Sequence, residues 1–178
     1  MQDPIQIARL QPADAVPYRE LMLEAYEQAA DAFTSTAAER AAEPESFWTR
    51  RIADASGLSA AFGAFQGTRL VGTVALEFSV KPKTRHKALL IGMYVRPAAR
   101  GQRAGSALMA AALRFARARQ GVQTLTLTVT QGNEAAISLY QRFGFVAFGV
   151  EPMAILTPDG FKGKVHMWRA VRADDQAP

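Results

Sequence analysis

The chain has 178 residues, 49% apolar and 21% charged, and we predict a single domain over residues 1–178 with its own core. The absence of cysteine excludes disulfides, Cys-ligated metal and an acyl-cysteine intermediate, and only two histidines argue against a metal site. The net charge is +5, but between Phe78 and Asn133 lie ten Lys/Arg and no Asp or Glu. This electropositive block favours binding of nucleic acid or of a phosphorylated cofactor, unless it is only a solvated basic face.

The first third of the chain predicts one strand followed by helices. Residues 5–10 alternate as a strand does, and a helix start follows, with Asp14 as its N-cap residue. Residues 31–43 are polar and small, which predicts a loop with helical fragments. Residues 44–46 open a second helix, which ends at Gly57.

After residue 57 the apolar pattern changes to a period of two. This predicts three strands, over residues 58–65, 70–80 and 88–95. Residues 104–119 are rich in Ala, Leu and Arg with an apolar face, which predicts a helix. The remaining predicted elements are a strand over 122–130, a helix over 133–143, strands over 145–150 and 165–171, and a frayed tail after Arg172. This order predicts a mixed sheet with helices packed on it.

The connection from the third strand to the long helix carries the clearest functional signal. Residues 96–106 read Arg-Pro-Ala-Ala-Arg-Gly-Gln-Arg-Ala-Gly-Ser. A helix N-terminus presents unpaired N–H groups and the positive end of its dipole, and small side chains let a phosphate approach them. The glycine spacing matches neither a nucleoside triphosphate P-loop nor a dinucleotide fold. The connection is therefore an anion site or a plain glycine turn.

Two motifs frame this helix. Residues 93–97 read Met-Tyr-Val-Arg-Pro, and residues 100–108 read Arg-Gly-Gln-Arg-Ala-Gly-Ser-Ala-Leu. Residues 133–145 read Asn-Glu-Ala-Ala-Ile-Ser-Leu-Tyr-Gln-Arg-Phe-Gly-Phe. Together they resemble the GNAT superfamily of N-acetyltransferases, whose motifs are Gln/Arg-x-x-Gly-x-Gly/Ala and Asn-x-x-Ala-x-x-Leu-Tyr-x-x-x-Gly-Phe. The resemblance covers nearly the whole chain.

The resemblance implies both a fold and an activity. The fold would be α/β (α+β), with a mixed, mostly antiparallel central sheet of about seven strands, helices on both faces and a splay between strands four and five. The activity would be transfer of the acetyl group of acetyl-CoA to a primary amine by direct attack, without a metal. A homodimer is a further expectation from the resemblance alone.

The resemblance also implies roles for single residues. Backbone groups of Met93 and Val95, with Tyr94 between them, would bind the pantetheine arm and the acetyl carbonyl. Asn133 would contact the cofactor, or cap its own helix, or both. Tyr140 would protonate the leaving thiolate, unless it is only a core tyrosine. The pyrophosphate would be held by Arg100, Gly101, Gln102, Arg103, Ala104, Gly105 and Ser106.

Arg103 departs from the family pattern, which has glycine at this position. Arginine is compatible with helical or bridge dihedral angles, whereas a positive φ would remodel the loop and lower the affinity. We expect the compatible conformation because the rest of the motif is intact.

The general base is less defined. An ammonium must lose a proton before it attacks, and residues 88–95 contain no carboxylate. Glu77 on the preceding strand is the candidate base, and a water molecule is the alternative base. If Glu77 is not catalytic, it is a solvent-facing strand residue or the ion-pair partner of a basic neighbour. Glu151 is a weaker candidate. His86 lies among basic neighbours that lower its proton affinity, so we expect a structural or cofactor-side role.

The acceptor amine is not encoded in any motif. It could be a polyamine, an aminoglycoside-like compound, an amino acid or a protein amine. A non-catalytic acyl-CoA-binding regulatory module is the alternative function. We expect no nucleic acid partner, because the basic block offers chiefly Tyr94 and Phe115 for stacking, both on elements predicted to be buried. With no membrane-spanning run and no signal-peptide pattern, we expect a cytoplasmic protein.

Overall fold

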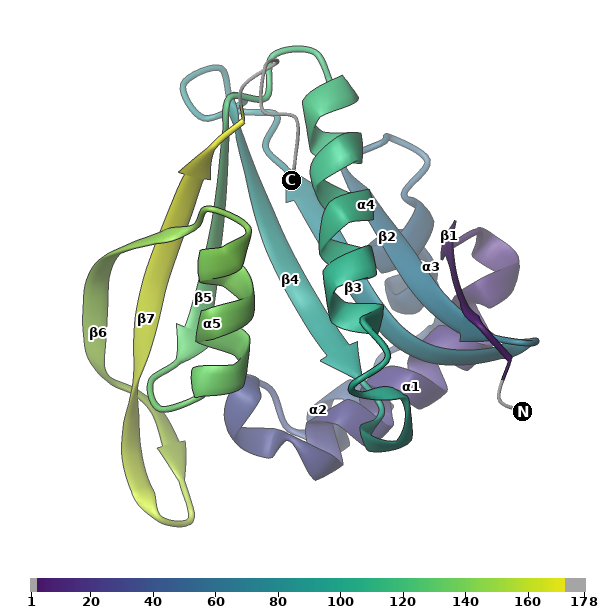
Figure 1. The fold of residues 1–178 in the computed structure, drawn as a ribbon, viewed down its shortest axis with the longest axis horizontal. Helices are drawn as coiled ribbons and strands as arrows, with labels where there is room; N and C mark the ends of the chain where they lie inside the picture. Colours follow the sequence, from purple (N-terminus) through teal and green to yellow (C-terminus); the bar gives the residue numbers. More distant parts are fainter. Residues whose placement is uncertain (1–2, 172–178) are drawn as a thin grey trace.

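Seven strands form one sheet in the order β1-β2-β3-β4-β5-β7-β6, in a computed structural model that describes residues 3–171 (Figure 1). Every neighbouring pair is antiparallel except β4 and β5. This confirms the mixed, mostly antiparallel sheet. The strands are β1 (Ile5–Arg9), β2 (Ser59–Gln66), β3 (Arg69–Phe78), β4 (Lys87–Val95), β5 (Thr124–Thr130), β6 (Val146–Thr157) and β7 (Gly160–Ala170).

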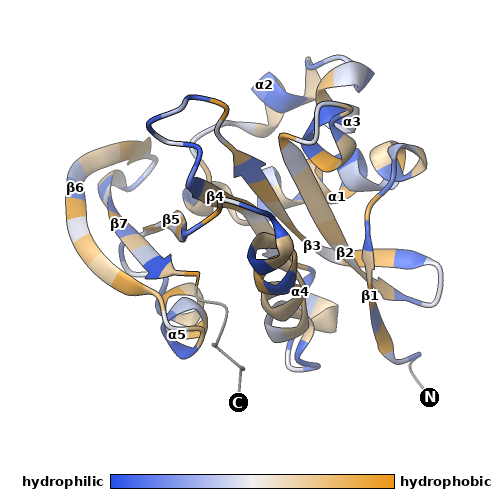
Figure 2. Ribbon diagram, turned by 90° about the horizontal axis from the view of Figure 1, so that it is seen from above, coloured by the Kyte–Doolittle hydropathy of each residue, from blue (hydrophilic) through white to orange (hydrophobic). Residues whose placement is uncertain are grey.

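Helices cover both faces of the sheet, as predicted (Figures 1 and 2). One face carries α4 (Ala104–Ala118) and α5 (Glu134–Arg142). The other face carries α1 (Ala15–Gln28) and α3 (Glu45–Ala53), with the short α2 (Ala37–Ala41) beside them. The three short 3-10 turns are Pro12–Asp14, Ala30–Ala32 and Pro97–Ala99. Among residues 3–171, no helix is long and apolar enough to cross a membrane.

Alternation along the central strands divides the core into two layers. On β3, Val74 and Leu76 join the cluster under α4 and α5, whereas Ala75 faces the cluster under α1 and α3. A strand that is buried on both faces explains why β3 is apolar at nearly every position. The central strands are thus held from both sides, and they provide a rigid frame for β4 and β5.

Two details differ from the sequence-based expectations. The late strands extend to the turn at residues 157–160, well beyond the limits at Val150 and Val165, because the tight turn lets both strands pair up to it. Asp14 does precede α1, but its carboxylate accepts the N–H of Gln11 at 2.7 Å and caps no amide of α1. The expected frayed tail after Arg172 lies outside the described residues.

The sheet opens between β4 and β5, which confirms the predicted splay. The two strands pair only where residues 87–89 meet residues 124–126, and they separate beyond that point. On the other side of β4, Gly92 and Met93 stand opposite Val74 alone, between the pairs Ile91–Ala75 and Tyr94–Thr73, so β4 contains a bulge. Gly92 lies in the bulge with φ +62°, a conformation that glycine adopts without strain.

Candidate active site

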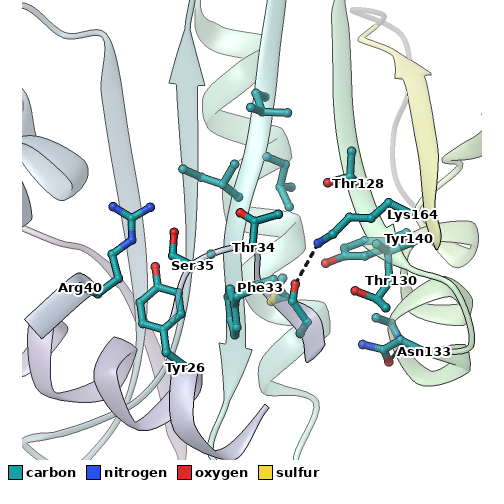
Figure 3. A pocket seen from close by; sticks show the side chains of 18 of the residues that line it. Tyr26, Phe33, Thr34, Ser35, Arg40, Thr128, Thr130, Asn133, Tyr140 and Lys164 are labelled. Atoms are coloured by element: carbon teal, nitrogen blue, oxygen red, sulfur yellow. Dashed lines mark hydrogen bonds between the residues drawn. The ribbon is translucent and has the colours of Figure 1, made fainter. Parts of the chain in front are cut away.

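A cavity of about 280 Å³ fills the splay (Figure 3). Its walls come from β4, β5, α5, and the loop after α1, so it is lined from both faces of the sheet. The loop is fastened over the opening by polar bonds: Thr130 donates its hydroxyl to the carbonyl of Asp31, and Lys164 donates to that of Ala32 at 3.3 Å. The gap between the two strands is therefore walled by side chains from both faces of the sheet and by this loop.

Three of the predicted site residues meet in this cavity. Met93 comes from the end of β4, and Asn133 and Tyr140 come from α5. They belong to the two separate sequence motifs, which lie some forty residues apart in the chain. The parallel β4–β5 pairing brings them together, because it places the start of α5 beside the end of β4.

Tyr140 is buried, with 6% of its surface exposed, and its ring packs edge-on against Phe145 at a centroid distance of 6.0 Å. Burial raises the pKa of the phenol from its ordinary value near 10 to about 12. The hydroxyl is therefore fully protonated throughout the range in which enzymes operate. A protonated phenol that faces a cavity is a hydrogen-bond donor for a developing anion.

Asn133 caps α5. Its side-chain Oδ1 accepts the N–H of Ala136 at 3.2 Å, which is the structural role considered from the sequence. The residue also lines the cavity, so its side-chain amide N–H₂ group remains on the cavity side of the helix start. The capping role is thus established, and it is compatible with a contact to a ligand.

The loop before α4 has two residues in the left-handed region. Gly101 has φ +76°, and Arg103, the N-cap position of α4, has φ +62° and ψ 12°. The expectation that Arg103 would keep a helical or bridge conformation was therefore wrong. The loop needs a positive φ where the family pattern has glycine, and the arginine adopts it at the cost of backbone strain.

The remaining loop residues define its shape. Arg100 donates from Nε to the carbonyl of Val95 at 3.0 Å, and Gln102 donates to the carbonyl of Ala98 at 3.2 Å. The bond from Ala107 N–H to the carbonyl of Arg103 is the first of the helical ladder, so the amides of residues 104–106 precede it and point out of the helix start. A Cβ at Gly105 would lie 3.4 Å from Leu139, which shows how closely α4 approaches α5.

The end of β4 is anchored to α1. Glu24 accepts from Arg96 Nε at 2.8 Å and from the Tyr94 hydroxyl at 3.2 Å. The Tyr94 side chain is 4% exposed in the core under α1, so only its backbone is available to a ligand in the splay. Arg96 also donates to the carbonyl of Leu70 at 2.7 Å. The strand end that enters the anion loop is thereby fixed in direction.

The candidate bases lie away from Tyr140. Glu77 is half exposed and 4.0 Å from Arg51, in a second hollow that does not include the cavity residues of α5. Its neighbour across the β3–β4 ladder, Leu89, does line the cavity. Glu151 contacts His166 at 3.2 Å on the exposed part of the late strands. The carbonyl of His86 accepts the N–H groups of Gln123 and Thr124, a structural contact.

A second tyrosine and three cationic residues also line the cavity without any sequence signal. They are Tyr26 of α1, Arg40 of α2, Arg51 of α3 and Lys164 of β7. Lys164 is 6% exposed, and burial lowers the pKa of its ammonium, an effect that Glu151 partly opposes. No motif could have indicated these residues, because they come from four elements that only the fold brings together. Residues 3–171 contain no group of three or more metal-ligating side chains.

Comparison with known proteins points to one family. The model of the acetyltransferase (GNAT) family matches residues 19–145. The mycothiol acetyltransferase of Streptomyces scabiei is 35% identical over 92 residues, which are 52% of this chain but 29% of that longer protein. The similarity to this relative therefore covers only part of its length.

Solved structures share the whole fold. An acetyltransferase of the GNAT family from Streptococcus pneumoniae has a TM-score of 0.77 at 24% identity, with 94% of this chain and 99% of that chain covered. A GCN5-related N-acetyltransferase from Kribbella flavida has a TM-score of 0.78 at 23% identity, covering 93% and 97%. The structure of yncA from Salmonella typhimurium with its cofactor acetyl-CoA has a TM-score of 0.79 at 18% identity, covering 99% and 98%.

Proposed function

Because this chain belongs to the acetyltransferase (GNAT) family, we propose that it moves the acetyl group of acetyl-CoA to a primary amine, with residues 1–178 acting as one domain. The observation that carries the proposal is the cavity in the β4–β5 splay, where Met93, Asn133 and Tyr140 of the two motifs meet. The cavity is lined from both faces of the sheet, so the proposed donor and acceptor would lie on opposite sides of it.

The donor side is the α4–α5 face. The amides of residues 104–106 and the positive end of the α4 dipole suit the pyrophosphate, with Arg100 and Arg103 adding charge. No atom lies within 4 Å of a Cβ placed on Gly101, so a phosphate has room at this turn. Beyond Leu89, the edge of β4 has no strand beside it, and backbone groups of Met93 and Val95 would bind the pantetheine arm as an added strand does.

In this proposal, Arg100 has to release the carbonyl of Val95. Its Nε now donates to that carbonyl at 3.0 Å. A diphosphate at the start of α4 offers the guanidinium a stronger, charge-assisted partner than a carbonyl oxygen. Binding of the diphosphate would therefore free Val95 for the pantetheine arm.

The chemistry follows from the position of Tyr140. The neutral amine forms a bond to the acetyl carbon, the C–S bond breaks, and the sulfur leaves with the electron pair. Tyr140 gives its proton to the sulfur as the negative charge develops there. A phenol with a pKa of about 12 is a weak acid, so the transfer accompanies bond breaking and does not precede it. Solvent returns the proton to the phenolate.

The amine loses its own proton to water in the cavity. Glu77 does not line the cavity, so it would act through water passing beside Leu89, its neighbour across the ladder. The carboxylate would then accept, through that water, the proton that the ammonium gives up before the attack.

The proposal is tested by incubating the protein with acetyl-CoA and a panel of primary amines while free thiol is measured. Thiol release that requires an amine, with the acetylated amine identified by mass spectrometry, is the expected result. Coenzyme A binding without turnover of any amine would instead indicate the non-catalytic regulatory module, and it would overturn the proposed transfer.

We also propose that the chain forms a homodimer through the edge strand β6. Most of β6 has the colour of hydrophobic residues in Figure 2, its large apolar side chains are exposed, and it is the outer strand of the sheet that the described residues form. These exposed side chains are Val146, Phe148, Val150, Met153 and Leu156 of β6, with Phe161 and Trp168 of β7. Sedimentation equilibrium should give a dimer that Phe148→Glu weakens, and a monomer at every concentration would contradict this assignment.

A further inference from the structure

The splay cavity has an uneven charge. Three cationic side chains line it, Arg40, Arg51 and Lys164, and no Asp or Glu is among the described residues that do so. A site that binds cationic amines such as polyamines would need carboxylates to compensate the charge of the ligand. The cavity instead favours a ligand that carries negative charge.

Arg40 is held in place but keeps unused donors. Its guanidinium stacks over the ring of Phe47 at 4.8 Å and lies 5.9 Å from the ring centre of Tyr26. Its ion pair with Glu43 is long, with Nη1 and Oε1 3.5 Å apart. Its Nε is buried and has no hydrogen-bond partner, so this guanidinium is incompletely satisfied by the protein.

Arg51 has a similar set of partners. Its Nη1 is 4.0 Å from Glu77, and its Nε is also buried without a hydrogen-bond partner. The contrast is Arg96, whose Nε lies 2.8 Å from Glu24 and whose Nη1 bonds to a backbone carbonyl. The guanidinium that anchors β4 thus bonds through two of its nitrogens, whereas Arg40 and Arg51 line the cavity with one longer ion pair each, and Arg51 also interacts with the buried hydroxyl of Tyr18. A guanidinium presents several N–H donors, so both arginines can still bind an oxyanion.

The location separates this charge from the donor site. Arg40 and Arg51 come from α2 and α3, on the face of the sheet opposite α4 and α5. Figure 3 shows Arg40 and Tyr26 on one side of β4, and Tyr140 and Asn133 on the other. The arginines are therefore separated from the start of α4, where the pyrophosphate is proposed to bind.

We propose that the acceptor is a small amine bearing an oxyanion close to its amino group, an amino acid carboxylate or a similar group, which Arg40 and Arg51 bind. This inference rests on the proposed acetyl transfer and specifies its acceptor. Lys164 adds positive charge near the reacting end.

The test compares matched acceptors. Thiol release is measured for the proteinogenic amino acids, and for the amide and the decarboxylated amine of each. The amide has the less basic and therefore more often neutral amine, so a preference for the acid cannot result from amine reactivity. We expect kcat/KM for the best acid to exceed that of its amide by at least about 10-fold, as a charge-assisted hydrogen bond provides.

Variants test whether Arg40 and Arg51 bind the carboxylate of the acceptor. Arg40→Gln and Arg51→Gln should each lower the ratio of acid to amide kcat/KM by about 10- to 100-fold. Arg50→Gln removes the same charge from an exposed position of α3 and should leave the ratio unchanged. Arg51→Lys keeps the charge but loses the paired donors, so its ratio of acid to amide kcat/KM should lie between those of the wild type and Arg51→Gln. Circular dichroism and melting temperature verify that each variant is folded.

Two results would overturn the inference. One is a best acceptor that is neutral or cationic, and the other is a ratio that neither glutamine variant changes. If no amine releases thiol, the proposed transfer fails, and calorimetry on the protein saturated with coenzyme A still decides the inference. Amino acid binding that Arg51→Gln weakens would support the anion site, and no binding of any amino acid would contradict it.

Discussion

Arg103 gives the most direct test of the loop geometry. With φ +62° it occupies the left-handed region, which costs a residue with a Cβ about 1–2 kcal/mol. Glycine avoids this cost in the folded protein. It also makes the unfolded chain more flexible, which stabilises the unfolded state by about 0.4–1 kcal/mol and offsets part of the gain in folded-state stability. Arg103→Gly should therefore raise the free energy of unfolding by about 0.5–1 kcal/mol, or the melting temperature by about 1–4 °C.

Arg103→Ala is the matched control, because it removes the same side chain and keeps the Cβ. Equilibrium urea unfolding of the three proteins separates the two effects: the glycine variant should be more stable than the alanine variant, with equal m-values. Both variants should bind coenzyme A less tightly if the guanidinium contacts a phosphate. Equal stability of the glycine and alanine variants would refute the claim that this position is strained.

Further predictions concern the bulge, the base and the acid. Gly92→Ala should lower the free energy of unfolding by about 0.5–1 kcal/mol, the cost of its φ less the entropy that alanine removes from the unfolded chain, since the nearest atom to an added Cβ is 3.8 Å away; unchanged stability in urea would contradict this. Glu77→Gln should lower kcat/KM by less than about 10-fold if the carboxylate acts through water, and a ~10²–10⁴-fold loss would indicate direct catalysis. The absorbance difference between wild type and Tyr140→Phe should titrate at about pH 12, and a midpoint at 10 would refute the burial argument. Because the pKa of Tyr140 is raised in the folded state, the stability that the neutral phenol contributes is complete below pH 10 and is lost as the pH rises toward 12. The free energy of unfolding of the wild type should therefore fall more between pH 10 and 12 than that of Tyr140→Phe.

Much of the fold followed from local patterns. Period-two alternation located the strands, and glycine and proline punctuation located their ends to within a few residues over most of the chain. The late strands were harder, because β6 is an edge strand whose apolar side chains are mostly exposed, so it lacks a buried face to fix its limits. The predicted splay followed from the family resemblance, since strand separation leaves no local sequence pattern.

The site was predictable only where motifs carry it. Met93, Asn133 and Tyr140 lie in recognisable sequences, and the fold places them in one cavity. The conformation of Arg103 was misjudged because sequence similarity does not report dihedral angles. Arg40 and Arg51 had no sequence signal, since the helices α2 and α3 that carry them meet the cavity only through tertiary packing.

The central claim is that Tyr140 faces the reacting thioester and supplies the proton. The measurement is thiol release by Tyr140→Phe, which removes one hydroxyl and keeps the ring packed on Phe145. We predict a kcat lower by about 10²–10⁴-fold with coenzyme A affinity within about 3-fold of wild type. A Tyr140→Phe enzyme with the kcat of the wild type would contradict the account.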